Sequence, residues 1–106
     1  MRVRISSLYI CVKDMERAIN FYECLLSQTV KKRDDIYSVF GINGFRFGLF
    51  ANEKVNESHI YGDNCLPSFE IDNISLVQER LLSLNCPIEF ADTEGNHIGL
   101  TSPIKQ

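Results

Sequence analysis

The chain has 106 residues, of which 44% are hydrophobic and 24% are charged, and its formal net charge is −3. This length fits one compact domain with a core of its own, and the composition excludes global disorder. The negative net charge does not favour binding to nucleic acid or to an anionic membrane surface.

Apolar runs and cysteines indicate the compartment. No segment reaches the roughly 20 apolar residues of a membrane-spanning helix, and the apolar run at residues 8–12 is too short for a signal peptide. The cysteines, Cys11, Cys24, Cys65 and Cys86, form no C-x-x-C pair, which argues against a zinc site. We expect a cytoplasmic protein with reduced thiols, although an even number of cysteines also permits disulfides.

The first half of the chain predicts a strand, a helix and a hairpin. Residues 3–12 alternate with a period of two, as in a strand that buries one face. Asp14 is a good N-cap for an amphipathic helix of about three turns. Residues 28–34 and 36–42 are predicted strands, and Asn43-Gly44 predicts a tight turn into a strand at 45–51.

The second half repeats this order after a polar linker or long loop at residues 52–64. A strand is predicted at 66–71, then a helix between Asn73 and Asn85, then short strands at 87–90 and 97–102. Val12-Lys13-Asp14-Met15 and Ile71-Asp72-Asn73-Ile74 match at an offset of 59 positions (71 − 12). This weak internal repeat predicts an α+β fold in which helices cover one face of the sheet.

The other face of the predicted sheet carries a distinct set of side chains. The alternation places there Ser7, Tyr9, Cys11, Glu70 and His97. This face must be covered by solvent, by a partner subunit or by a ligand.

Motifs from both halves resemble the vicinal oxygen chelate superfamily, which includes glyoxalase I, bleomycin-resistance proteins and extradiol dioxygenases. The first half carries V-x-D-hydrophobic at 12–15 and F-Y-x-x-x-L at 21–26, and the second half carries a pattern similar to D-P-x-G-N-x-I at 92–98. Each motif is weak alone, but together they follow the order of the family over nearly the whole chain. The family's glycine after the first helix is Ser27 here.

The resemblance implies one domain of two β-α-β-β-β-like modules, at 1–51 and 65–106, joined by the linker. Their sheets would curl into a half-barrel around a pocket, with the helices on the outer face. The second module is shortened, because Pro87–Phe90 runs almost directly into the Gly-Asn turn. A missing strand leaves an open sheet edge, which a second copy of the chain often covers, so we expect a homodimer.

The resemblance also predicts which positions should hold a metal. Family enzymes place His or Glu ligands on the pocket face of four strands, and these positions fall on Ser7, Gly48, Leu66 and Gly99. Leucine and glycine side chains cannot bind a cation, and serine is a poor ligand for a transition metal. We therefore expect no metal and no other cofactor, and no metal-dependent glyoxalase or dioxygenase chemistry at the usual place.

Several residues on the predicted pocket face are candidates for ligand binding: Tyr9, Cys11, Arg46, Phe50, Glu70 and His97. Arg46 and Phe50 beside Gly48 could hold a flat or anionic ligand, or they could be an exposed arginine and an interface phenylalanine. Glu70 could orient His97 as an acid–base pair, or both could be ordinary solvated residues.

Three functions remain open at this point. The first is a metal-independent small-molecule-binding protein, similar to the sequestering bleomycin-resistance proteins. The second is a lyase or isomerase that uses Glu70 and His97 or a relocated metal site. The third is a dimerisation scaffold without a ligand.

Overall fold

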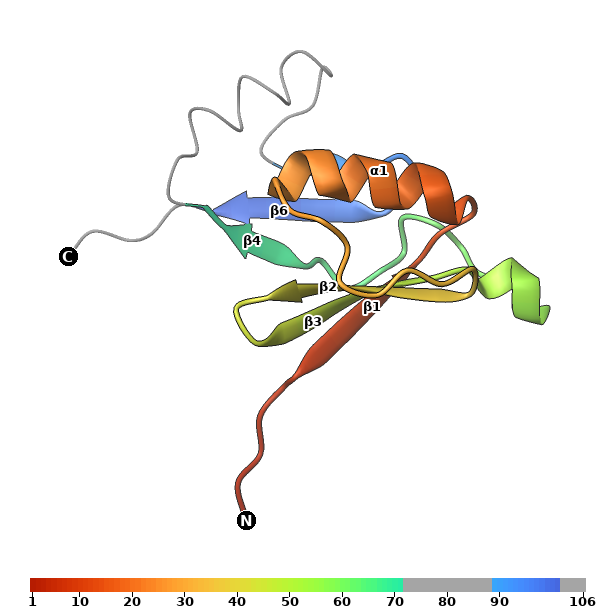
Figure 1. The fold of residues 1–106 in the computed structure, drawn as a ribbon. Helices are drawn as coiled ribbons and strands as arrows, with labels where there is room; N and C mark the ends of the chain where they lie inside the picture. The colour runs from red at the N-terminus through yellow and green to blue at the C-terminus, as the bar shows by residue number, and fades with distance from the viewer. Residues whose placement is uncertain (72–88, 102–106) are drawn as a thin grey trace. The chain divides into compact units, whose positions relative to one another are not determined.

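The computed structural model describes residues 1–71 and 89–101, and over these ranges the protein is a mixed α+β structure (Figure 1). The chain divides into two compact units, Met1–Ile60 and Tyr61–Gln106. The boundaries expected from the sequence, 1–51, 52–64 and 65–106, remain a prediction. In the described part of the chain, no helix combines the length and the apolar character needed to cross a membrane.

The first unit contains a three-stranded sheet in the order β1-β3-β2. Strand β1 (Ser7–Cys11) runs parallel to β3 (Phe45–Phe50), and β2 (Tyr37–Ile42) is antiparallel to β3. Asn43 and Gly44 have φ angles of 50° and 85°, which a tight two-residue hairpin turn requires. The hairpin predicted from Asn-Gly is therefore confirmed, and Figure 1 shows it beside β1.

Helix α1 (Met15–Leu26) begins where the sequence predicts. The Asp14 side chain accepts a hydrogen bond from the Arg17 N–H at 3.0 Å and so caps the first turn. The predicted apolar stripe is buried, and the fully buried Tyr22 ring packs edge-on against Phe47 and Phe40 at centroid distances of 5.2 and 6.3 Å. The helix therefore covers the face of the sheet that carries Phe40 and Phe47.

Two local predictions in the first unit differ from the structure. Residues 28–34 do not form a strand. Within them, Lys32 makes an isolated β-bridge with Val39. The reason is a turn, because the Asp34 carboxylate accepts hydrogen bonds from the N–H groups of Ile36 and Tyr37 and reverses the chain. Within the expected linker, Asn52–Val55 forms a short 3-10 helix, η1.

The second unit contains a smaller sheet in the order β4-β6-β5. Strand β4 (Ser68–Glu70) is parallel to β6 (His97–Thr101), and β5 (Glu89–Ala91) is antiparallel to it. The buried Asp92 carboxylate accepts hydrogen bonds from the N–H groups of Glu94 and Asn96, which closes the predicted turn between β5 and β6.

Some predictions fall outside the described residues. These are the helix between Asn73 and Asn85, the beginning of the strand at 87–90, and Cys86. Cys11, Cys24 and Cys65 are thiols and not members of disulfides.

Candidate ligand-binding site

The strand register of the first unit brings four of the candidate residues onto one face. Tyr9 pairs with Gly48, Cys11 pairs with Phe50, and Arg46 pairs with Ser7. Paired residues point to the same side of a sheet, and alternate residues along a strand share a face. The face opposite α1 therefore carries Tyr9, Cys11, Arg46 and Phe50 together; we call it the open face.

An aromatic cluster occupies one end of the open face. The Tyr9 ring contacts Phe50 and Tyr37 edge-on, at centroid distances of 5.5 and 6.2 Å. Tyr9 is 57% exposed although it lies in the middle of a strand. Exposed rings of this kind supply a large apolar contact area with a polar tip, which is typical of ligand and partner surfaces.

Tyr37 is the residue of this cluster that the sequence reasoning missed. It pairs with Phe50 across β2 and β3 and so reaches the open face. The sequence contains a signal for this pairing, because a tight turn at Asn43-Gly44 makes Ile42 and Phe45 cross-strand partners. Partners in such a hairpin have numbers that sum to 87 (42 + 45), and 37 is then the partner of 50.

Gly48 lies beneath the Tyr37 side chain. A Cβ atom at Gly48 would lie 2.8 Å from Cε2 of Tyr37 and closer still to its hydroxyl oxygen. The absence of a side chain at position 48 therefore lets Tyr37 lean diagonally across the sheet towards Tyr9. Any larger residue would displace Tyr37 from this position.

Cys11 contributes little surface to the open face. It is buried, and burial together with the negative charge of Glu57 raises the pKa of its thiol. A raised pKa keeps the thiol protonated near neutral pH, so Cys11 is a poor nucleophile. It acts as a small packing residue beside Phe50.

The second unit places Glu70 and His97 on one face of its sheet but not beside each other. Glu70 pairs with Thr101, whereas His97 pairs with Ala91. Four residues along β6 separate the two positions, which corresponds to about 13 Å. Of the two interpretations open from the sequence, this register favours ordinary strand residues over a direct acid–base pair, because it sets Glu70 and His97 at opposite ends of the strand.

His97 is instead held by Asn64. The Asn64 side chain accepts a hydrogen bond from the His97 N–H and donates one to the His97 carbonyl, both at 3.0 Å. These two bonds imitate the pairing of a neighbouring strand. They fix the start of β6 to the loop at 61–65.

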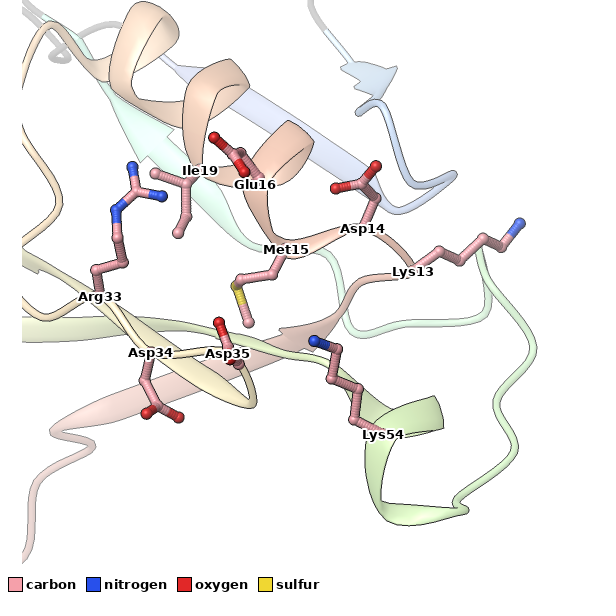
Figure 2. Close-up of a pocket in the computed structure, with 9 residues that line it drawn as sticks. All are labelled: Lys13, Asp14, Met15, Glu16, Ile19, Arg33, Asp34, Asp35 and Lys54. Atoms are coloured by element: carbon pink, nitrogen blue, oxygen red, sulfur yellow. The ribbon is translucent and has the colours of Figure 1, made fainter.

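A separate cavity of about 400 Å³ lies in the first unit beside the beginning of α1 (Figure 2). The first turn of α1, the turn at 33–35 and η1 supply its walls, which carry Lys13, Asp14, Met15, Glu16, Ile19, Arg33, Asp34, Asp35 and Lys54. None of the sequence-predicted site residues lines it.

The charges of this cavity are mixed and partly engaged with the backbone. Asp14 caps α1. Hydrogen bonds from the N–H groups of Ile36 and Tyr37 lower the pKa of Asp34. Both acidic and basic side chains line the cavity, so its lining favours neither an anion nor a cation.

Comparison with known proteins identifies the family. The model of the glyoxalase/bleomycin resistance protein/dioxygenase superfamily matches residues 4–102. The chain belongs to this superfamily. A comparison with curated protein sequences gives no significant match.

Several solved structures share the fold at low sequence identity. Protein ATC0852 from Agrobacterium tumefaciens is 15% identical with a TM-score of 0.78, covering 98% of this chain and 100% of that one. A lactoylglutathione lyase from the same organism is 14% identical with a TM-score of 0.75, covering 96% and 95%. A glyoxalase-related enzyme from Fulvimarina pelagi is 14% identical with a TM-score of 0.73, covering 94% and 88%. At these identities the likeness concerns the fold alone.

The superfamily's metal does not fit the residues present here. Of the four positions expected to carry its ligands, Gly48 is covered by Tyr37. A Cβ atom at Gly99 would lie 2.8 Å from Oγ of Ser68 and 3.7 Å from Cδ2 of Leu66. Ser7 offers only a hydroxyl group. Over residues 1–71 and 89–101, no group of three or more His, Cys, Asp or Glu side chains is placed to hold a metal ion.

Proposed function

We propose that this member of the glyoxalase/bleomycin resistance protein/dioxygenase superfamily is a metal-independent small-molecule-binding protein. Its ligand is held on the open face of the first unit. The observation that carries the proposal is the position of Tyr37, which lies over Gly48 where the family resemblance predicts a metal ligand. A phenol beside two further rings offers contact area and a hydrogen-bond group in place of a cation.

The open face has the composition of a small-ligand site. Such sites combine aromatic or apolar walls with a few polar groups that fix orientation. Tyr9 and Phe50 supply the walls, and Arg46 supplies a charged group on the same face. Glu70 and His97 remain candidate ligand contacts in the second unit, and the half-barrel with a shortened second module remains a prediction from the family resemblance.

Metal-dependent lyase chemistry is the less favoured function. One solved structure with this fold is that of a lactoylglutathione lyase, but the likeness to it concerns the fold alone. The glycine positions argue against it, because Gly48 and Gly99 have no donor atoms and neighbouring side chains occupy the adjacent space. The lack of a direct Glu70–His97 pair removes the motivation for a metal-free acid–base mechanism.

Metal titration tests the first half of the proposal. The purified full chain is dialysed against nickel, zinc or manganese, and its metal content and melting temperature are then measured. We expect substoichiometric metal and an unchanged melting temperature, since a ligand specific to the folded state raises it by mass action. One equivalent of tightly held metal that raises the melting temperature would contradict the proposal.

A thermal-shift screen of small aromatic and aliphatic compounds tests the second half. Compounds that raise the melting temperature of the wild type should lose most of this effect with Tyr9→Ala. They should keep it with Val55→Ala, a control that removes another exposed apolar side chain, in η1. The proposal fails if no compound stabilises the chain, or if the stabilising compounds are indifferent to Tyr9→Ala.

A further inference from the structure

The open face carries an uneven distribution of charge. Among the residues that the three strands place on it, Arg46 is the one charged residue. The stem of Lys31 also reaches this face, because a Cβ atom at Gly41 would lie 3.1 Å from Cδ of Lys31. Gly41 pairs with Arg46, so the two cations lie at the same end of the sheet.

The carboxylate of Glu57 acts at the opposite end of this face. Glu57 influences Cys11, which is four residues along β1 from the Ser7–Arg46 pair, a separation of about 13 Å. The cationic end of the open face therefore has no carboxylate from its own strands. This arrangement is local, because the whole chain has a net charge of −3.

On the open face, the distance between the aromatic cluster and Arg46 suits one small molecule that contacts both. Arg46 and Gly48 are two residues apart on β3, which corresponds to about 6–7 Å. A single aromatic ring that lies against Tyr9 and against the Tyr37 ring that covers Gly48 therefore carries a ring substituent towards Arg46. A guanidinium group is well suited to a planar carboxylate, which it can bind through two parallel hydrogen bonds.

We propose that the open face selects a planar aromatic anion, such as an arylcarboxylate. The ring of the ligand lies against Tyr9 and Tyr37, and its anionic group lies towards Arg46 and Lys31. This inference rests on the proposed function and adds the class of ligand to it.

Matched probes test the class of ligand. Benzoate and benzamide have nearly the same shape and differ in charge. Each is titrated into the ¹⁵N-labelled full chain, and the shifts of the backbone amides of Tyr9, Gly48 and Phe50 give its dissociation constant. We expect benzoate to bind about three- to fivefold more tightly than benzamide, the range of a solvent-exposed ion pair, and to lose this advantage at high salt.

Charge-removing variants locate the recognition. Arg46→Gln is expected to weaken benzoate binding about three- to fivefold and to leave benzamide binding unchanged. Lys31→Gln should act in the same direction with a smaller effect, because its ammonium group is less directional than a guanidinium. Arg17→Gln is the matched control, since it removes the same charge from an exposed position on α1.

The outcomes separate this inference from the proposed function. Equal binding of both probes, with no effect of Arg46→Gln, would overturn the anionic class but leave small-molecule binding intact. A failure of both probes to shift the Tyr9, Gly48 and Phe50 amides, even at millimolar concentration, would overturn the aromatic class, whereas the proposed function is decided by the thermal-shift screen. A benzoate preference that survives Arg46→Gln and Lys31→Gln would place the anion site elsewhere and also overturn the inference.

Discussion

At the scale of single residues, glycine and tyrosine define the open face together. Gly48 has no side chain, and the space above it is filled by Tyr37, which the hairpin register brings from the neighbouring strand. The pair explains why a glycine is tolerated in the interior of a central strand, where it usually weakens a sheet. The packing of the Tyr37 ring against Gly48 compensates for the missing side chain at position 48.

We expect Gly48→Ala to destabilise the chain by about 1–3 kcal/mol, because the new methyl group overlaps the Tyr37 ring. Urea unfolding of the full chain measures this change. The double variant Tyr37→Ala/Gly48→Ala should recover part of the loss, since the overlap is gone. Gly41→Ala is the control, because its Cβ would meet only the flexible Lys31 stem. Equal costs for Gly48→Ala and Gly41→Ala would refute the close packing of Tyr37.

The Cys11 thiol provides a prediction of pH dependence. Its pKa is raised chiefly by burial and secondarily by Glu57, so the thiolate forms only at a pH above the ordinary range of a cysteine. Alkylation by iodoacetamide, followed by peptide mapping, should therefore reach half its maximal rate at a higher pH for Cys11 than for N-acetylcysteine. Glu57→Gln should move that midpoint modestly downwards, because it removes the smaller of the two causes.

Glu53→Gln is the matched control for this experiment, because Glu53 is an exposed carboxylate in η1. It should leave the Cys11 profile unchanged. Alkylation of Cys11 with the profile of the small thiol would show that burial does not protect it.

At the scale of elements, helix α1 has a well-formed beginning and a strained end. Asp14 satisfies a first-turn N–H, as the sequence predicts. The C-cap residue Ser27 has φ 53° and ψ 43°, a left-handed conformation that glycine adopts more readily than serine. This is also the position at which the family has a glycine.

Ser27→Gly is therefore expected to stabilise the chain by about 0.5–1 kcal/mol, because glycine relieves the left-handed conformation. Urea unfolding measures the change. Ser27→Ala serves as the control, since it removes the hydroxyl group but keeps the Cβ atom. Equal destabilisation by Ser27→Gly and Ser27→Ala would contradict this prediction. It would mean that the serine hydroxyl group stabilises the fold by more than the left-handed backbone conformation destabilises it.

At the scale of the whole molecule, the sequence predicted local features better than contacts between strands. Alternation along β1 and β3 placed Tyr9, Arg46 and Phe50 on the correct face, because side-chain direction follows from the pleat alone. The distance between Glu70 and His97 could not be predicted in the same way, because it depends on the β4–β6 register. No single strand encodes that register.

Other features could not be predicted from the sequence, because they too depend on contacts between separate segments. The position of Tyr37 over Gly48 depends on a diagonal contact between strands, and the cavity beside α1 depends on three separate segments. The bridge at Lys32 replaced a predicted strand because one carboxylate, Asp34, closed a turn there. Binary patterning does not contain such side-chain-to-backbone bonds.

The predicted homodimer also belongs to this scale. Among the described residues, the sheet of the second unit has only three short strands, and exposed strand edges of this kind favour pairing with another chain. Sedimentation equilibrium of the full chain, whose mass is 12.2 kDa, should therefore show a species of twice that mass. A single 12.2 kDa species across the micromolar range would contradict the dimer.

The ring that lies over Gly48 also has a consequence for sequence variation. A side chain added at position 48 would meet the Tyr37 ring, and a smaller residue at position 37 would leave the space above Gly48 open. We therefore expect close homologues of this chain to keep or change positions 37 and 48 as a pair.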